Sequence, residues 1–79
     1  MKLAERIEAN PDVMLGKPVI RGTRVPVELI LRRISEGATE EALLTSYPHL
    51  TRDDVRAAVA FAADTIANDE TVETVAHRA

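Results

Sequence analysis

Two arginines flank a glycine–threonine pair in the stretch Gly16–Val27, which reads GKPVIRGTRVPV. Guanidinium groups suit a carboxylate or phosphate because their N–H donors match two oxygens of the anion. If Gly22 and Thr23 form a two-residue loop, Arg21 and Arg24 lie opposite each other on one face of a β-ribbon. Like charges in that position destabilise a ribbon by up to ~1 kcal/mol. An anion between them would remove the cost, so the pair is a candidate anion-binding site.

A second interpretation of the arginine pair stays open. Both side chains are long enough to turn into solvent, or to contact Glu8, Asp12 or Glu28 of the same chain. The charge around them is polarised: residues 17–33 hold five basic residues against one acid, and residues 35–54 hold five acids against one base. Such a molecule can bind an anion, or a second copy of itself. The net charge of −3 argues against a simple polyanion binder.

The element that must position the arginines is a predicted β-hairpin over residues 17–27. Its flanks carry the β-branched residues Val19, Ile20 and Val25, and glycine at the first central position suits a type II′ turn. Two strands alone are marginal in water. We therefore expect residues 2–9 (KLAERIEA) to supply a neighbouring strand, although their composition also suits a helix.

Three helices are predicted over about residues 27–36, 39–46 and 51–67. Gly37 supplies the left-handed residue that ends the first, Thr39 caps the second, and Pro48 prevents its continuation. Thr51 and Asp54 form a capping box for the third. The fold class is mainly α, a short-stranded β-hairpin followed by a three-helix helix-turn-helix domain. One domain then covers residues 1–67, and residues 68–79 form a polar tail.

The third predicted helix has more apolar surface than a small core requires. The predicted core positions of the three helices are Val27, Ile30, Leu31, Ile34, Leu43, Leu44, Tyr47, Val55, Val59, Ala62 and Ile66. Ala57, Ala60 and Phe61 then occupy other faces of the third helix, and a helix that is apolar on every side is normally buried on every side. We expect these three residues to form a homodimer interface. The alternative is that alanine is a good helix former that tolerates water.

The second and third helices have the proportions of a helix-turn-helix, whose second helix presents its N-terminal residues to the major groove of DNA. Arg52 and Arg56 would meet guanines or phosphates there, whereas Asp53 and Asp54 would repel the DNA backbone. The candidate nucleic-acid or anion-binding residues are therefore Lys17, Arg21, Arg24, Arg32, Arg33, Arg52 and Arg56.

Catalytic and metal-binding machinery is not predicted. The chain has no cysteine, and His49 and His77 lack a metal-ligand spacing. Its three glycines are too far apart to form a phosphate-binding loop. We expect no cofactor, no metal and no small-molecule substrate. No apolar run approaches the ~20 residues that span a bilayer, so we expect a cytoplasmic protein without a membrane partner.

The segment from NPDVMLGKPV to AVAFAADT closely resembles a small prokaryotic family, a domain of unknown function grouped with VapB-type antitoxins and classed among homeodomain-like folds. The resemblance covers roughly residues 7–66. Its distinctive parts are GKPVIRGTRVPV, YPHLTRDDV and the glycine before ATEE. Members typically carry two glycines before the lysine, where this chain has Leu15-Gly16. We therefore expect the loop before the hairpin to differ.

The resemblance implies an antitoxin that neutralises a PIN-like ribonuclease toxin encoded beside it, and that binds its own promoter DNA as a dimer. Residues of the shared motif, Lys17, Arg21, Gly22, Thr23 and Arg24, are then a suspected binding or assembly element. The alternative from another class is a homo-oligomeric interaction module that binds no nucleic acid.

Overall fold

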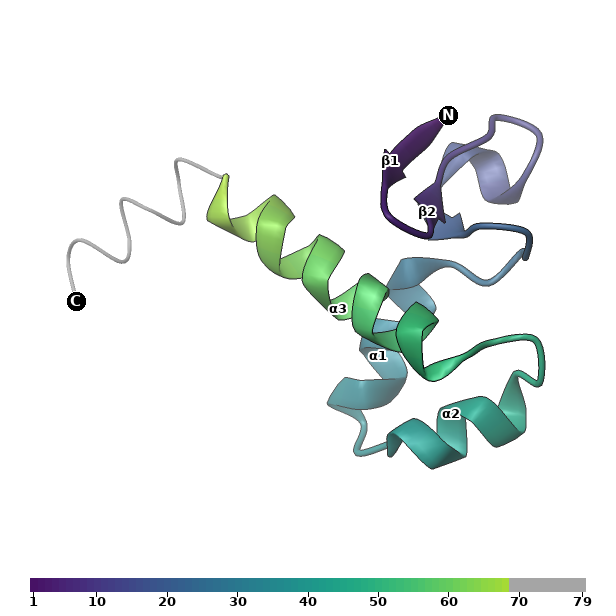
Figure 1. Ribbon diagram of the computed structural model, residues 1–79, viewed down its shortest axis with the longest axis vertical. Coiled ribbons are helices and arrows are strands. Elements are labelled where there is room, and N and C mark those ends of the chain that lie inside the picture. Colours follow the sequence, from purple (N-terminus) through teal and green to yellow (C-terminus); the bar gives the residue numbers. More distant parts are fainter. Residues whose placement is uncertain (69–79) are drawn as a thin grey trace, which may run out of the picture.

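A computed structural model of the chain describes residues 1–68, in which a small antiparallel sheet precedes three helices (Figure 1). The strands are β1 (Lys2–Ala4), β2 (Ile7–Glu8) and β3 (Val19–Ile20), in the spatial order β1-β2-β3. Ile7 pairs with Ile20 and Glu8 with Val19. The predicted fold class is confirmed. The strand expected within residues 2–9 is present as two short strands.

The hairpin turns one residue earlier than predicted. The backbone N–H of Thr23 donates to the carbonyl of Ile20 (3.0 Å), and Gly22 has φ 77°, as a type II turn requires at its third position. Ile20 lies opposite Val25, as expected, but the loop contains all four residues 21–24. The prediction of a type II′ loop is wrong, because the Thr23 hydroxyl forms hydrogen bonds with the backbone on both sides of the loop. It donates to Ile20 O (2.7 Å) and accepts from the N–H of Val25 (3.0 Å).

The loop before the hairpin contains an unusual left-handed turn. Met14, Leu15 and Gly16 have φ values of 48°, 58° and 79° and form the short 3₁₀ segment Met14–Gly16. A left-handed conformation costs an L-residue roughly 1–2 kcal/mol. The backbone of Leu15 is therefore strained, whereas glycine would adopt the same conformation without strain. The Leu15 side chain is 93% exposed.

The helices of the described region are α1 (Val27–Ser35), α2 (Glu40–Ser46) and α3 (Arg52–Ala67), each within one residue of the predicted bounds. Thr39 Oγ1 accepts from the N–H of Ala42 (3.1 Å). The capping box is complete: Asp54 N donates to Thr51 Oγ1 (3.2 Å) and Thr51 N donates to Asp54 Oδ2 (3.0 Å). None of these helices is both long and apolar enough to cross a bilayer.

The core lies where the sheet meets the three helices, and it contains Ile7, Ile20, Val27, Ile30, Leu43, Leu50, Val55 and Ala58. One prediction for α3 is wrong, since Val59 and Ile66 are 45% and 54% exposed. The buried face runs instead from Asp54 and Val55 to Ala58. It is turned this way because the Asp54 side chain points inward to the sheet. The second half of α3 runs away from the sheet and from α2 (Figure 1).

Candidate binding surfaces

Arg6 joins the sheet to the start of α3, a link that the sequence did not predict. Its Nη1 lies 3.1 Å from Asp54 Oδ1 and its Nη2 lies 3.6 Å from Asp53 Oδ2. Its own carbonyl accepts from the N–H of Arg21 (2.8 Å), and its φ is 66°. The carboxylate of Asp54 thus receives two donors, Arg6 and the N-cap backbone, and the acidic start of α3 is largely used internally.

Four of the seven predicted anion-binding residues form surface ion pairs within residues 1–68. Exposed pairs contribute only about 0–1 kcal/mol each, but they reduce the positive charge available to an external anion. Arg32, and then Lys17, hold the pKa of Glu28 below its ordinary value, so this acid is charged at neutral pH. The pairs are Lys17 and Arg32 with Glu28 (3.4 and 3.2 Å), Arg33 with Glu36 (2.8 Å) and Arg52 with Glu40 (3.3 Å).

The other three, Arg21, Arg24 and Arg56, have no ion-pair partner in the described part of the chain. Arg21 and Arg24 belong to the loop of the hairpin. Arg56 lies elsewhere, on α3, beside a hollow that Val59 and Ala60 also line. The structure therefore keeps the hairpin arginines together and leaves Arg56 apart from them.

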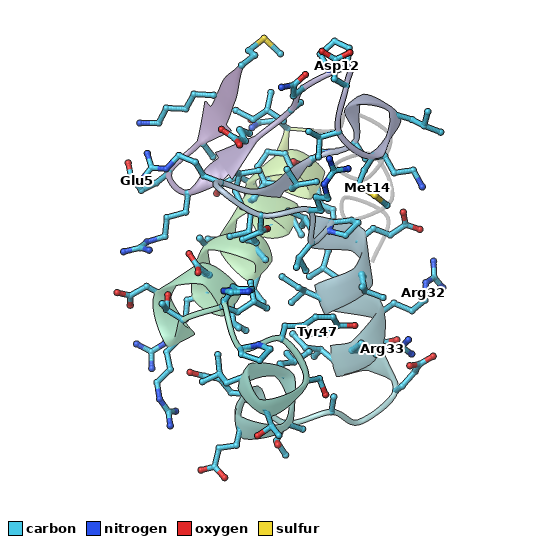
Figure 2. The ribbon with its side chains drawn as sticks, turned by 90° about the vertical axis from the view of Figure 1, so that its right-hand side faces the viewer. Glu5, Asp12, Met14, Arg32, Arg33 and Tyr47 are labelled. Carbon is cyan, nitrogen blue, oxygen red and sulfur yellow. The ribbon has the colours of Figure 1, made fainter. Side chains whose placement is uncertain are left out.

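Two adjoining hollows form a trough that we call the Tyr47 trough. They share Arg24, Val25 and Tyr47, which separate a hollow of about 470 Å³ from one of about 600 Å³. Tyr47 lies next to Arg33, with Met14 and Arg32 on the same side of the molecule (Figure 2). Glu36, and then the Tyr47 hydroxyl, raise the pKa of Arg33. The remaining lining residues are Met14, Pro26, Glu28, Leu29 and Arg32 of the first hollow, and Glu8, Val13, Gly22, Thr23, Ser46, Pro48 and His49 of the second.

A third hollow of about 480 Å³, the α1–α3 groove, lies between α1 and the second half of α3. Its walls are apolar, and the Glu28–Arg32 ion pair lies on its rim. The lining residues are Pro18, Val27, Glu28, Leu31 and Arg32 on one side and Phe61, Ala62, Thr65 and Ile66 on the other.

The predicted dimer residues do not share one exposed face. Ala57 and Phe61 are half-buried against the core, and Phe61 also lines the α1–α3 groove. Ala60 is exposed and lines a different hollow with Val59 and Ala63. Which residues of α3 are exposed depends on which face of the helix packs against the core. The spacing of apolar residues along α3 did not fix that face, so it did not identify Ile66 as the exposed apolar residue of the groove.

The described residues contain no group of three or more His, Cys, Asp or Glu side chains that could hold a metal ion. Their buried side-chain nitrogen and oxygen atoms all have hydrogen-bond partners. Buried polar groups in residues 1–68 are thus used in the fold itself. The sites that this region offers are surface hollows with apolar walls and charged rims.

Short strands, three helices and apolar surface hollows define a small mixed sheet-and-helix domain. The chain belongs to the family described as "Protein of unknown function (DUF433)", which matches residues 7–62.

Three relatives illustrate this membership. The uncharacterized protein y4eO of Sinorhizobium fredii is 36% identical over 58 residues, which cover 73% of this chain and 26% of that protein. The chain therefore spans about a quarter of the length of this relative. An uncharacterized protein of Archaeoglobus fulgidus is 54% identical over 28 residues, 35% of this chain and 78% of that protein. The crystal structure of a DUF433 member from Anabaena variabilis is similar with a TM-score of 0.73 and 33% identity, covering 91% of this chain and 68% of that chain.

Proposed function

We propose that this chain is a non-enzymatic, antitoxin-like binding protein that neutralises a PIN-like ribonuclease toxin through the α1–α3 groove. The proposal places it in the cytoplasm, with the toxin. The observation that carries it is the exposed apolar surface on the second half of α3, where Ile66 is 54% exposed. Because Ile66 is already about half covered, burying the rest of its side chain contributes roughly 1–1.5 kcal/mol. A partner that fills the groove would bury Ile66 together with Leu31 and Phe61.

The resemblance to VapB-type antitoxins supports the class of partner, and the groove supports the place of contact. Exposed apolar patches with polar rims are typical of protein-interaction sites, and an aliphatic helix face laid into a complementary surface is a common recognition mode. The Glu28–Arg32 pair gives the α1–α3 groove such a rim.

A matched pair of substitutions on α3 tests the proposal. Ile66→Glu places a charge in the α1–α3 groove, whereas Val59→Glu places the same charge at a similarly exposed site that lines another hollow. Each variant is co-expressed with the nuclease encoded by the neighbouring reading frame, and inhibition of RNA cleavage is measured. We expect Ile66→Glu to lose inhibition and Val59→Glu to keep it, with both variants folded by circular dichroism. Full inhibition by Ile66→Glu would contradict the proposal.

A homo-oligomer is the alternative occupant of the same groove. The observation that favours it is the rim pair, because Glu28 and Arg32 present both charges on one surface and so can be self-complementary about a two-fold axis. Sedimentation of the isolated chain separates the two. A dimer that Ile66→Glu dissociates, without any inhibition of the nuclease by the wild type, would favour the homo-oligomeric module.

Operator binding is the part of the antitoxin proposal that the arginines would carry. Lys17, Arg32, Arg33 and Arg52 have acidic partners, so Arg21 and Arg56, which lie outside the Tyr47 trough, are left for phosphates. Promoter DNA from the same operon is titrated at increasing salt concentration. Affinity that falls steeply with salt would support phosphate neutralisation, and absence of binding at low salt would remove DNA from the proposed function.

A further inference from the structure

The Tyr47 trough has the form of a site for an extended chain. Its two hollows lie on either side of Arg24, Val25 and Tyr47, and their linings are formed by the hairpin, the loop before it, the outer side of α1 and the end of α2. None of the lining residues comes from α3. The trough shares Glu28 and Arg32 with the α1–α3 groove, to which the proposed function assigns the toxin, but it has no residue in common with the α3 wall of that groove.

Arg24 is the arginine of this trough that the described chain leaves without an ion pair. Arg32 is held by Glu28, and Glu8 at the far end accepts from the N–H of Gly22 (3.4 Å). A ligand that meets Arg24 would thus supply one carboxylate and then apolar groups for the walls, such as those of Val25, Pro26 and Leu29. A phosphate backbone fits less well, because its charged groups would leave the apolar walls beside Arg24 uncovered.

The chain itself contains a segment with this chemistry. Residues 70–75 read ETVETV, a glutamate followed two residues later by a valine, twice in succession. In an extended chain, residues two apart lie on the same side and about 6.6 Å from each other. Each repeat therefore presents a carboxylate and an aliphatic side chain together, as Arg24 and an adjacent apolar wall require.

We propose that the Tyr47 trough binds the segment Glu70–Val75 of a second copy of this chain, with a glutamate on Arg24 and a valine in the neighbouring hollow. We assign the occupant to another copy because no lining residue of the trough comes from α3, and the second half of α3 runs away from the sheet and from α2 (Figure 1). Reciprocal exchange of these segments would join two chains through charge complementarity and a small apolar contact.

A fluorescein-labelled peptide of sequence DETVETV tests the site by fluorescence anisotropy. The full-length protein carries Glu70→Lys and Glu73→Lys, so that its own segment does not compete. We expect saturable binding that Arg24→Glu weakens roughly fivefold or more, the scale of one exposed ion pair replaced by a contact between like charges. Arg56→Glu is the matched control, since Arg56 also has no ion pair within residues 1–68 but lines a different hollow. Absence of binding, or equal weakening by both arginine variants, would overturn the proposal.

Mixing two variants then decides whether the segment comes from a second copy. Arg24→Glu keeps the segment and loses the trough, whereas Glu70→Lys/Glu73→Lys keeps the trough and loses the segment. In sedimentation, we expect each variant alone to be less associated than wild type, and an equimolar mixture to recover a heterodimer with one intact contact. Peptide binding without any association of the wild type or the mixture would overturn the assignment to a second copy. Neither readout involves the nuclease or Ile66, so failure here is distinguishable from failure of the proposed function.

Discussion

Replacing the buried Asp54 with alanine should destabilise the domain more than removing any exposed charge of residues 1–68. The residue is 7% exposed, although it is an aspartate in the first turn of a helix. Its carboxylate accepts from the N–H of Thr51 at 3.0 Å and from Arg6 Nη1 at 3.1 Å. Both bonds disappear in Asp54→Ala, and the Arg6 guanidinium keeps only the 3.6 Å contact with Asp53.

The magnitude follows from these two contacts. Loss of a capping interaction costs about 1 kcal/mol. A charge-assisted hydrogen bond contributes about 1.5–3 kcal/mol when buried, and we reduce this to roughly 1–2 kcal/mol because the Arg6 side chain is 39% exposed. The unfolding free energy of Asp54→Ala should therefore fall by about 2–3 kcal/mol. For a domain of this size this is a decrease in Tm of roughly 8–24 °C.

Urea denaturation, followed by circular dichroism, measures the loss, and Asp53→Ala is the control. Asp53 lies in the same turn but its side chain is 67% exposed and its contact with Arg6 is longer, so we expect a change within about 0.5 kcal/mol. A double-mutant cycle with Arg6→Ala should give a coupling energy of about 1 kcal/mol between Arg6 and Asp54. Equal losses for the two aspartates, or a coupling energy near zero, would refute the reasoning.

Three further predictions concern the loops and the surface charges. Gly22→Val should lower the free energy of unfolding by about 1–2 kcal/mol. The loss comes from the positive φ of Gly22 and not from a clash, because a Cβ at this position meets open space. An unchanged urea midpoint would contradict the type II turn at Gly22. Leu15→Gly should raise the free energy of unfolding by up to about 1 kcal/mol, since it relieves the left-handed conformation of Leu15 and removes a side chain that is already exposed. A lower melting temperature would show that the Leu15 side chain makes stabilising contacts. Arg32, and then Lys17, keep the pKa of native Glu28 below 4.5, so its contribution to stability is present above that pH and is lost as the pH falls through the lowered pKa. Between about pH 6 and pH 3, the Tm of Glu28→Gln should therefore decrease less than the Tm of the wild type. Parallel decreases of the two Tm values would count against the effect.

The helix ends could be predicted from the sequence because their determinants are local. Thr39 caps a helix through a bond to Ala42, and Thr51 and Asp54 satisfy each other's backbone within one turn. Gly37 ends α1 with φ 96°. Each of these interactions joins residues that lie close together in the chain, so their types and spacing suffice to identify them.

The features that could not be predicted depend on contacts between distant parts of the chain, or on a single side chain. The turn of the hairpin was misplaced because the Thr23 hydroxyl bonds to two backbone groups, and no propensity rule anticipates this choice. The buried face of α3 was misassigned because Asp54, a charged residue, is turned inward by Arg6. Apolar periodicity counts Val59 and Ile66 as core residues and has no means of seeing that pairing.

The sequence predicted which types of residue form the candidate binding surfaces better than it predicted how these residues are arranged. The sequence pointed to Arg21 and Arg24, and the structure leaves both without an ion pair within residues 1–68. It also pointed to Lys17, Arg32, Arg33 and Arg52, which the structure places in pairs with acids. The hollows beside Tyr47 and Ile66 arise only when separate elements pack together, and for that reason no motif marks them.

The contact between Arg6 and Asp54 joins residues 48 positions apart. During synthesis, Arg6 is therefore made before Asp54, the group that fixes it. Until α3 starts to form, the first strands lack this anchor, and the outer edge of β1 is open to other chains. A nascent chain that stalls before Asp54 should be a target for chaperones and proteases, whereas one that has passed it can close into a protected unit.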